Sequence, residues 1–272
     1  MLAHVESAPM DDTFIGRMDS ELAGWSHPVQ RLRGAIDNNE FELYCQPILQ
    51  LAGGDGYPMA EVLVRLREEE RALLPPGDFL PVFEHYRMMP QLDRWVVRHA
   101  AKHLAQGSRI AAFTINVSGQ TLDDAEFPRF VAGQLATHQL AAARIGFEID
   151  EADLLVRLDA VERFAASMKG IGAFVLVDGF ARRGVSFGPL RNLGAHFVKV
   201  DGRLTRKVLS SEGARSKLTA ILRVGERFGF GVVAECVEEQ DILLRLKAMG
   251  VAFAQGFGIS QPHPIDRLAL GS

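Results

Sequence analysis

Short apolar runs alternate with longer segments of helical period along most of this chain. The runs are rich in β-branched and aromatic residues, which is typical of strands buried on both faces. Strands and helices that alternate in this way predict an α/β fold with a mostly parallel sheet. The expected strands cover residues 41–45, 59–64, 111–117, 145–149, 173–177, 196–200, 231–234 and 251–257.

Helical periodicity fills most of the intervals between these runs. Eight strands in a unit of this length favour a closed (β/α)8 barrel of the TIM type, because such barrels need about 250 residues. A doubly wound open sheet is the alternative, but no GxGxxG follows the first run. We expect residues 28–272 to form the barrel and residues 1–27 to be a tail or a helical extension. The expected helices cover residues 91–104, 127–140, 159–168, 216–228 and 242–249.

Composition narrows the range of partners. The net charge is −4, and acids and bases are intermixed along the 272 residues. This argues against binding to long nucleic acid, which normally needs a basic face, but it allows a small anionic ligand. Neither cysteine lies in a CxxC pair, no apolar run approaches the ~18 residues that span a membrane, and the start lacks a signal-peptide pattern. We therefore expect a cytoplasmic protein without a membrane span.

Polar side chains recur near the ends of the expected strands. The carboxyl ends of barrel strands converge on one face, where crowded carboxylates need a cation. A single acid of this kind is usually a helix cap, but a set that spans six strands is not explained in that way. Oxygen donors suit Mg²⁺, Mn²⁺ or Ca²⁺, so the pattern suggests a metal-assisted reaction on a phosphate ester. The set is Gln46, Glu61, Asn116, Glu148 with Glu151, Asp178, Lys199 with Asp201, Glu235 with Glu238, and Gln255.

Several short motifs follow one another in an order typical of the EAL domain family. They are QPI at 46–48, AEVLVR at 60–65, PPGDFLP at 75–81 with Glu84, NVS at 116–118, EIDE at 148–151, KVD at 199–201, AECVE at 234–238 and QGF at 255–257. The chain resembles this family over residues 29–264. So many ordered motifs make a chance agreement very improbable.

The resemblance implies a fold, a ligand and site residues. Active EAL domains are (β/α)8 barrels that use two Mg²⁺ or Mn²⁺ ions to hydrolyse one phosphodiester of cyclic di-GMP, and a homodimer is implied as well. The catalytic residues would be Lys199, which orients the attacking water, and Glu235, which holds metal or acts as general base. Glu151 would anchor the loop after the strand at 173–177. The first ion would be held by Glu61, Asn116, Glu148 and Asp178, and the nucleotide by Gln46, Arg65, Gln255 and Glu238.

The chain departs from the family at residues 177–184. Active members have two adjacent aspartates followed by FGTG, whereas this chain keeps Asp178 and has Gly179 in the second place. Glycine offers no ligand atom, so one metal site is expected intact and the second is in doubt. Ala181, Arg182 and Arg183 replace small loop residues. One hypothesis is that Arg182 or Arg183 turns inward and supplies the missing charge, and the alternative is a solvated surface pair.

Three functions remain open at this point. The preferred one is a cyclic di-GMP receptor whose hydrolysis is impaired by the loss at Gly179. The second is a working metal-dependent phosphodiesterase, since Glu235, Lys199 and the first-ion ligands are present. The third is a nucleotide-free module that binds a protein partner, although Gln46, Arg65 and Gln255 would then have no purpose.

Overall fold

Eight strands close into a barrel in the computed structural model, which describes residues 27–51, 53, 56–67 and 73–269. The closed (β/α)8-type barrel predicted from the sequence is confirmed, and all eight expected strands are present. The expectation for residues 1–27 lies outside the described residues, except for His27. In chain order the barrel strands are β1 (Phe41–Gln50), β2 (Met59–Arg67), β4 (Ala112–Asn116), β5 (Ile145–Asp150), β6 (Phe174–Phe180), β7 (Phe197–Val200), β8 (Gly231–Ala234) and β9 (Phe253–Ala254).

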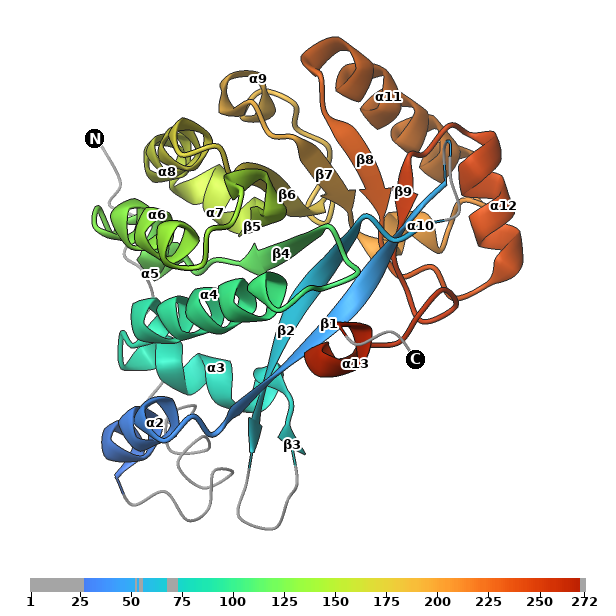
Figure 1. Ribbon diagram of the computed structural model, residues 1–272. Coiled ribbons are helices and arrows are strands. Elements are labelled where there is room, and N and C mark those ends of the chain that lie inside the picture. The colour runs from blue at the N-terminus through green and yellow to red at the C-terminus, as the bar shows by residue number, and fades with distance from the viewer. Residues whose placement is uncertain (1–26, 52, 54–55, 68–72, 270–272) are drawn as a thin grey trace, which may run out of the picture.

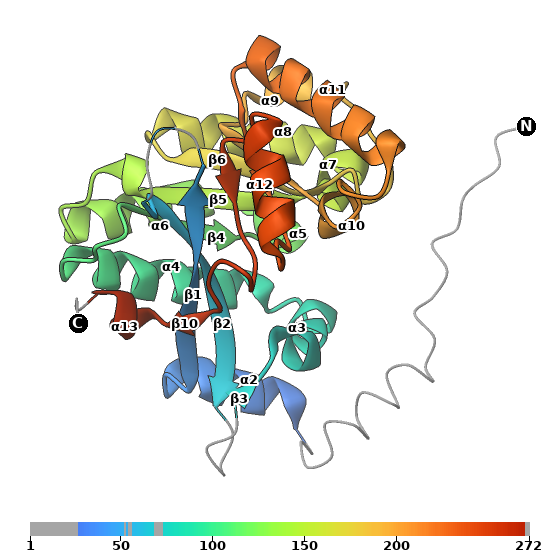
Figure 2. The ribbon, with the colours of Figure 1, turned by 90° about the vertical axis from the view of Figure 1, so that its right-hand side faces the viewer.

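Helices surround the barrel and connect its parallel strands (Figure 1). Two further short strands, β3 (Leu73–Leu74) and β10 (His263–Pro264), extend the sheet beside β2 and β1. The helix α13 near the C-terminal end packs against α4 and β1, as Figure 2 shows. The helices are α2 (Pro28–Asp37), α3 (Pro76–His85), α4 (Met89–Ala105), α5 (Gly119–Leu122), α6 (Phe127–Thr137), α7 (Glu151–Val156), α8 (Leu158–Gly170), α9 (Leu190–Leu193), α10 (Gly202–Thr205), α11 (Glu212–Phe228), α12 (Gln240–Ala248) and α13 (Ile265–Ala269), with a 3₁₀ turn at Ala142–Arg144.

The first strand runs against the other seven barrel strands. β1 pairs antiparallel with both β2 and β9, while β2, β4 and the later barrel strands pair in parallel. The expectation that Gln46 lies at the carboxyl end of a parallel strand is therefore wrong. Gln46 still faces the same end of the barrel as Glu61, because these two residues are directly opposite each other in the β1–β2 register.

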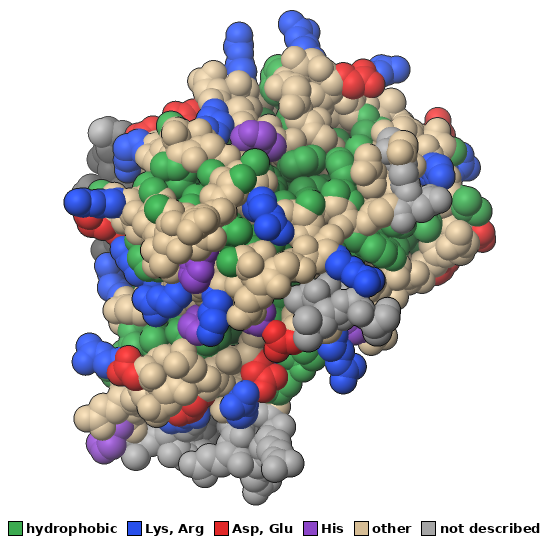
Figure 3. Space-filling view, in the orientation of Figure 1, with side chains coloured by type: hydrophobic (Ala, Val, Ile, Leu, Met, Phe, Trp, Pro, Cys, Tyr) green, Lys and Arg blue, Asp and Glu red, His purple; other side chains and the backbone are tan. Residues whose placement is uncertain are grey.

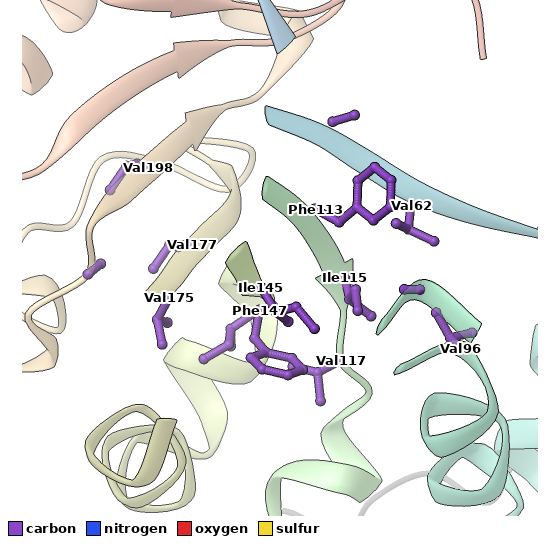
Figure 4. Packing of buried hydrophobic residues seen from close by; sticks show 14 of the residues in the cluster. Val62, Val96, Phe113, Ile115, Val117, Ile145, Phe147, Val175, Val177 and Val198 are labelled. Atoms are coloured by element: carbon purple, nitrogen blue, oxygen red, sulfur yellow. The ribbon is translucent and has the colours of Figure 1, made fainter. Parts of the chain in front are cut away.

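Alternate residues of each strand point outward and pack under the helices. Because successive side chains of a strand face opposite sides, one set forms the layer between barrel and helices. Figure 4 shows this packing around Phe113, Ile115, Phe147 and Val175, all of which are buried. This apolar layer holds the strand ends in fixed positions.

The inward-facing set closes one end of the barrel with an apolar floor. Ile48, Met59, Ala112, Phe174, Leu176 and Val233 form one buried cluster, with Phe197 and Phe253 packed against it. The aromatic rings need space from small neighbours: a Cβ on Gly146 would lie 2.2 Å from the ring of Phe174. The floor leaves only the other end of the barrel open to ligands.

Two expectations from the sequence concern a basic surface for long nucleic acid and a membrane-spanning segment. On the face drawn in Figure 3, Lys and Arg side chains are dispersed among acidic, histidine and apolar ones. No helix among the described residues is long and apolar enough to cross a bilayer.

Candidate functional site

The site begins two residues beyond the floor on each strand. On β6, Leu176 belongs to the floor and Asp178 is the next inward residue; on β8, Val233 is followed in the same way by Glu235. Because the side-chain period of a strand is two, the layer above the apolar floor is polar around the barrel. Its members are Gln46, Glu61, Thr114, Asn116, Glu148, Asp178, Lys199, Glu235 and Gln255.

A buried ammonium lies at the centre of this polar layer. Lys199, whose side chain is only 1% exposed, contacts four carboxylates. We call Lys199 and these four carboxylates the Lys199 cluster. Burial alone would drive out the proton of a lysine, but four acids around one cation favour the charged form. The distances from Nζ are 2.6 Å to Glu148, 2.8 Å to Glu61, 3.1 Å to Asp178 and 3.2 Å to Glu235.

The pKa values of these groups move in different directions. Burial raises the pKa of Glu148 to about 8, with Glu61 adding to the rise and Lys199 opposing it. Burial also raises the pKa of Glu235 well above its usual range. For Asp178 burial acts in the same direction, but Lys199 and hydrogen bonds outweigh it and lower the pKa. The pKa of Lys199 lies well above normal, because the carboxylates outweigh its burial.

Amide and hydroxyl groups tie the remaining members to this cluster. Asn116 Nδ2 donates to Glu61 Oε1 at 2.8 Å, and Gln255 Nε2 donates to Glu61 Oε2 at 3.0 Å. Gln255 also donates to Gln46 at 3.3 Å. Thr114 donates its hydroxyl proton to Glu148. The sequence patterns did not single out Thr114. Its position two residues before Asn116 places it on the same face of the strand, and this spacing is the signal that indicates it.

Arg182 lies inward at the ends of three strands. Its Nε is 3.0 Å from Asp201 Oδ2, its Nη1 is 2.9 Å from Asp150 Oδ2, and its Nη2 is 3.9 Å from Asp178 Oδ2. Hydrogen bonding to Asp201 raises the pKa of Arg182, with Asp150 and Asp178 adding to the rise. We call Arg182 and these three aspartates the Arg182 cluster. Asp150 had not been singled out by itself, and Asp201 had been given no role.

The loop that carries Arg182 is also held by its main chain. Glu151 is buried and accepts hydrogen bonds from the backbone N–H of Ala181 at 2.9 Å and of Arg183 at 3.3 Å. The Arg183 side chain is exposed. Both arginines of the loop are exposed residues, and the Arg182 side chain nevertheless contacts the aspartates.

Two predicted ligand contacts lie apart from the Lys199 cluster. Arg65 is four residues beyond Glu61 on β2, about 13 Å along an extended strand. It donates to the carbonyl of Val64 at 3.0 Å and lies over the ring of Tyr44. Glu238 pairs with Arg206 at 3.0 Å. Among the described residues, no hydrogen bond or ion pair joins Arg65 or Glu238 to the other predicted residues. Arg206 was not predicted.

Two pockets have lining residues that belong to the polar layer. One, of about 270 Å³, is lined by residues that include Gln46, Glu61, Glu235, Glu238 and Gln255, with Phe257 at its edge. The other, of about 450 Å³, lies between β2, α3, α4 and the end of β4 and is bordered by Asn116 and Asp150. Asn116, which borders the larger pocket, donates a hydrogen bond to Glu61, which lines the smaller one.

The donor atoms suit a hard divalent ion at the first expected position. Glu61, Asn116, Glu148 and Asp178 offer only oxygen ligands, as Mg²⁺ and Mn²⁺ prefer. Asp178 Oδ1 is buried without a well-aligned hydrogen bond. Among the described residues, however, no three acidic, histidine or cysteine side chains surround a common point as metal ligands do. The Lys199 ammonium occupies the centre of these carboxylates. The residues present do not fit the second expected ion, because Gly179 has no donor atom and the Arg182 guanidinium fills the space beside it.

Comparisons with known proteins agree on one family. The EAL domain model matches residues 29–262. The chain is 29% identical over 269 residues to cyclic di-GMP phosphodiesterase PdeF of Escherichia coli, covering 97% of this chain and 36% of PdeF. It is 29% identical over 238 residues to cyclic di-GMP phosphodiesterase PdeB of Shewanella oneidensis, covering 86% of this chain and 28% of PdeB. The chain thus spans about a third of the length of these relatives.

Solved structures show the same fold. The FimX EAL domain from Pseudomonas aeruginosa bound to c-di-GMP superposes with a TM-score of 0.80 at 23% identity, covering 87% of this chain and 96% of that one. The PaMucR phosphodiesterase in its c-di-GMP complex gives a TM-score of 0.81 at 24% identity, covering 89% and 99%.

Proposed function

Because the chain belongs to the EAL domain family, we propose that it is a signalling protein that binds cyclic di-GMP at the barrel mouth and hydrolyses it slowly or not at all. The observation that carries this proposal is the pocket beside the Lys199 cluster, which is lined by Glu61 and Glu235 of that cluster, together with a second pocket bordered by Asn116, the hydrogen-bond partner of Glu61. A cyclic dinucleotide has two nucleosides joined by two phosphodiesters, so it needs two recesses with a charged region between them. Two EAL structures of the same fold hold this nucleotide.

The smaller pocket has the groups that a guanosine needs. Phe257, which lines this pocket, is 63% exposed, and a base can stack on such a ring. Gln46 and Gln255 provide amide groups, and Arg206 provides a cation for a phosphate. We also propose that Arg65 and Glu238 contact the nucleotide beyond the cluster, as the resemblance implies.

Chemistry at the phosphodiester would depend on a bound ion. A divalent ion held by Glu61, Asn116, Glu148 and Asp178 would polarise a phosphoryl oxygen and lower the pKa of a water molecule. Lys199 Nζ would contribute a fixed positive charge beside that phosphate, and Glu235 would accept a proton. The missing carboxylate at position 179 removes the second half of a two-ion clamp, which is why we propose weak turnover.

Calorimetry with the purified chain tests the binding proposal. With Mg²⁺ or Ca²⁺ present, we expect cyclic di-GMP to saturate the chain below tens of micromolar, and Phe257→Ala to weaken binding about tenfold through lost stacking. Leu244→Ala is the matched control, because Leu244 is a similarly exposed apolar residue on α12 and lines neither pocket. The absence of binding at tens of micromolar would refute the proposal.

A working phosphodiesterase is the second candidate function. Lys199, Glu235 and three of the first-ion donors lie within the Lys199 cluster, and Asn116 is hydrogen-bonded to Glu61 of that cluster, an arrangement that favours this function. Rapid production of the linear dinucleotide in the presence of Mn²⁺, followed by chromatography, would establish that function instead. A homodimer, a protein partner and a cytoplasmic location remain predictions, and sedimentation analysis would check the first.

A further inference from the structure

Arg182 and Gly179 fit each other sterically. A Cβ placed on Gly179 would lie 2.2 Å from Arg182 Nη2 and 2.6 Å from Cζ, so any side chain at position 179 would enter the space that the guanidinium fills. Gly179 has a φ of +65°, where the β6–β7 register shifts by one residue. Glycine adopts this φ without strain. Arg182 thus lies where the side chain of an aspartate at position 179 would begin.

The aspartates around Arg182 are fixed in advance. Asp150 uses Oδ1 to accept from the Ala152 N–H at the start of α7, and Oδ2 to contact Arg182. Asp201 does the same at the start of α10, with Oδ1 on the Arg203 N–H and Oδ2 on Arg182. Each carboxylate is already oriented by its hydrogen bond to its own helix. When the ion pairs form, the conformational entropy lost is therefore mainly that of the Arg182 side chain.

The charges at the mouth explain why a cation is needed there. Six carboxylates belong to the two clusters: Glu61, Glu148, Asp150, Asp178, Asp201 and Glu235. Lys199 contacts four of them and Arg182 contacts three, with Asp178 shared between the two. Without Arg182, Asp150 and Asp201 would face Asp178 with no positive charge between them, and such a cluster attracts a divalent ion.

We infer that the Arg182 guanidinium is a tethered cation that takes the place of the second divalent ion at this mouth. A guanidinium neutralises charge and donates hydrogen bonds, but it offers no open coordination position and does not activate water. It also cannot dissociate, so its occupancy does not depend on the metal concentration. The mouth therefore keeps a cation in the second position while it loses the water activation that an ion would bring. This inference deepens the proposed function, but it can be tested without nucleotide.

The stoichiometry of Mn²⁺ binding tests the inference on the nucleotide-free chain. Equilibrium dialysis with elemental analysis would count the ions on the wild type, on Arg183→Ala and on the double variant Gly179→Asp/Arg182→Ala. Arg183→Ala is the matched control, because it removes the same charge from the same loop without touching the aspartates. We expect the double variant to bind one more ion per chain than the wild type and Arg183→Ala.

An equal ion count in the double variant and the wild type would overturn the inference, since Arg182 would not be what excludes the ion. Two ions on the wild type would overturn it as well. No ion on the wild type and one on the double variant would uphold it, while refuting the first-ion site in the proposed function. Failure to bind cyclic di-GMP, measured separately, would refute that function and leave the ion counts unaffected.

Hydrogen exchange on single variants gives a second test that does not need an aspartate at position 179. We expect Arg182→Ala to speed amide exchange of residues 181–187 at least tenfold, and millimolar Mn²⁺ to reverse that change by joining the three aspartates. Arg183→Ala should leave the exchange as in the wild type. Equal exchange in the two single variants would overturn the inference.

Discussion

The two clusters at the barrel mouth use a cation in different ways. Lys199 is a strand residue with a side chain 1% exposed, and the strand register alone directs it at its four partners. Arg182 is a loop residue with a side chain 37% exposed, and it reaches its partners because Gly179 leaves room. The Lys199 cluster is therefore part of the barrel core, whereas the Arg182 cluster can change without disturbing that core. Substitutions in the two clusters should therefore differ in their effects on stability and turnover.

The largest effect should follow from loss of the central lysine. Lys199→Met removes the ammonium and leaves four carboxylates together in a buried layer. Breaking a buried ion network in this way costs about 3 to 5 kcal/mol. Urea denaturation at pH 7 would measure the loss, and Lys217→Met on the exposed face of α11 is the control, with an expected change near zero. A loss as small as that of the control would mean that the lysine is not part of the core.

Restoring the second position should produce the next largest effect. The double variant Gly179→Asp/Arg182→Ala gains a carboxylate and loses the guanidinium beside it. We expect production of the linear dinucleotide with Mn²⁺ to rise about a hundredfold, or about 2.7 kcal/mol of transition-state stabilisation. Gly179→Asp alone should gain less, because the new aspartate would pair with Arg182. A double variant no faster than the wild type would show that the defect lies elsewhere.

Asp93 shows what a buried acid does without a central cation. This residue of α4 is 4% exposed and accepts hydrogen bonds from the Ser118 N–H, the Ser118 hydroxyl and the Thr121 hydroxyl. Burial raises its pKa to about 6, although these hydrogen bonds and Arg94 oppose the rise. Because the folded pKa exceeds the unfolded value, protonation favours the fold. The contribution of Asp93 is complete below pH ~4 and is lost as the pH rises to about 6.

The matching variant is Asp93→Asn, which keeps an acceptor but cannot ionise. The free energy of unfolding of the wild type, minus that of the variant, should fall by on the order of 2 kcal/mol between pH 4 and pH 7. Urea denaturation across this range would measure it. A difference that does not change with pH would mean that Asp93 is ionised at a normal pKa.

The smallest effect should be on stability at the loop. Arg182→Ala breaks ion pairs that are partly exposed, so we expect a loss of less than about 1 kcal/mol, and less still in high salt. Arg183→Ala should change stability by only a few tenths. Thermal melts at low and high salt would compare the two variants. A loss for Arg182→Ala as large as that for Lys199→Met would erase the distinction between the clusters.

The sequence predicted the positions of side chains correctly where the two-residue period of a strand determines the face on which they lie. The eight strands and the polar residues above the floor could be predicted, because buried strands require apolar runs and the end of each run is sharp. The direction of β1 could not be predicted, since every strand of a closed barrel under helices is covered on both faces, so the apolar run of β1 resembles those of its parallel neighbours. The inward turn of Arg182 was only one of two alternatives, because a long loop side chain has many rotamers and its partners come from three strands.

The antiparallel first strand has a consequence for how the molecule folds. β1 and β2 are neighbours along the chain and can pair early, but the other edge of β1 meets β9 at the far end of the sequence. The contacts of the site span the same interval: Gln255 and Gln46 are 209 residues apart, and Lys199 and Glu61 are 138 apart. Such non-local contacts form late in folding. A ligand that contacts residues from both ends of the sequence would therefore bind only the folded barrel. Its binding would stabilise the folded state relative to the unfolded one.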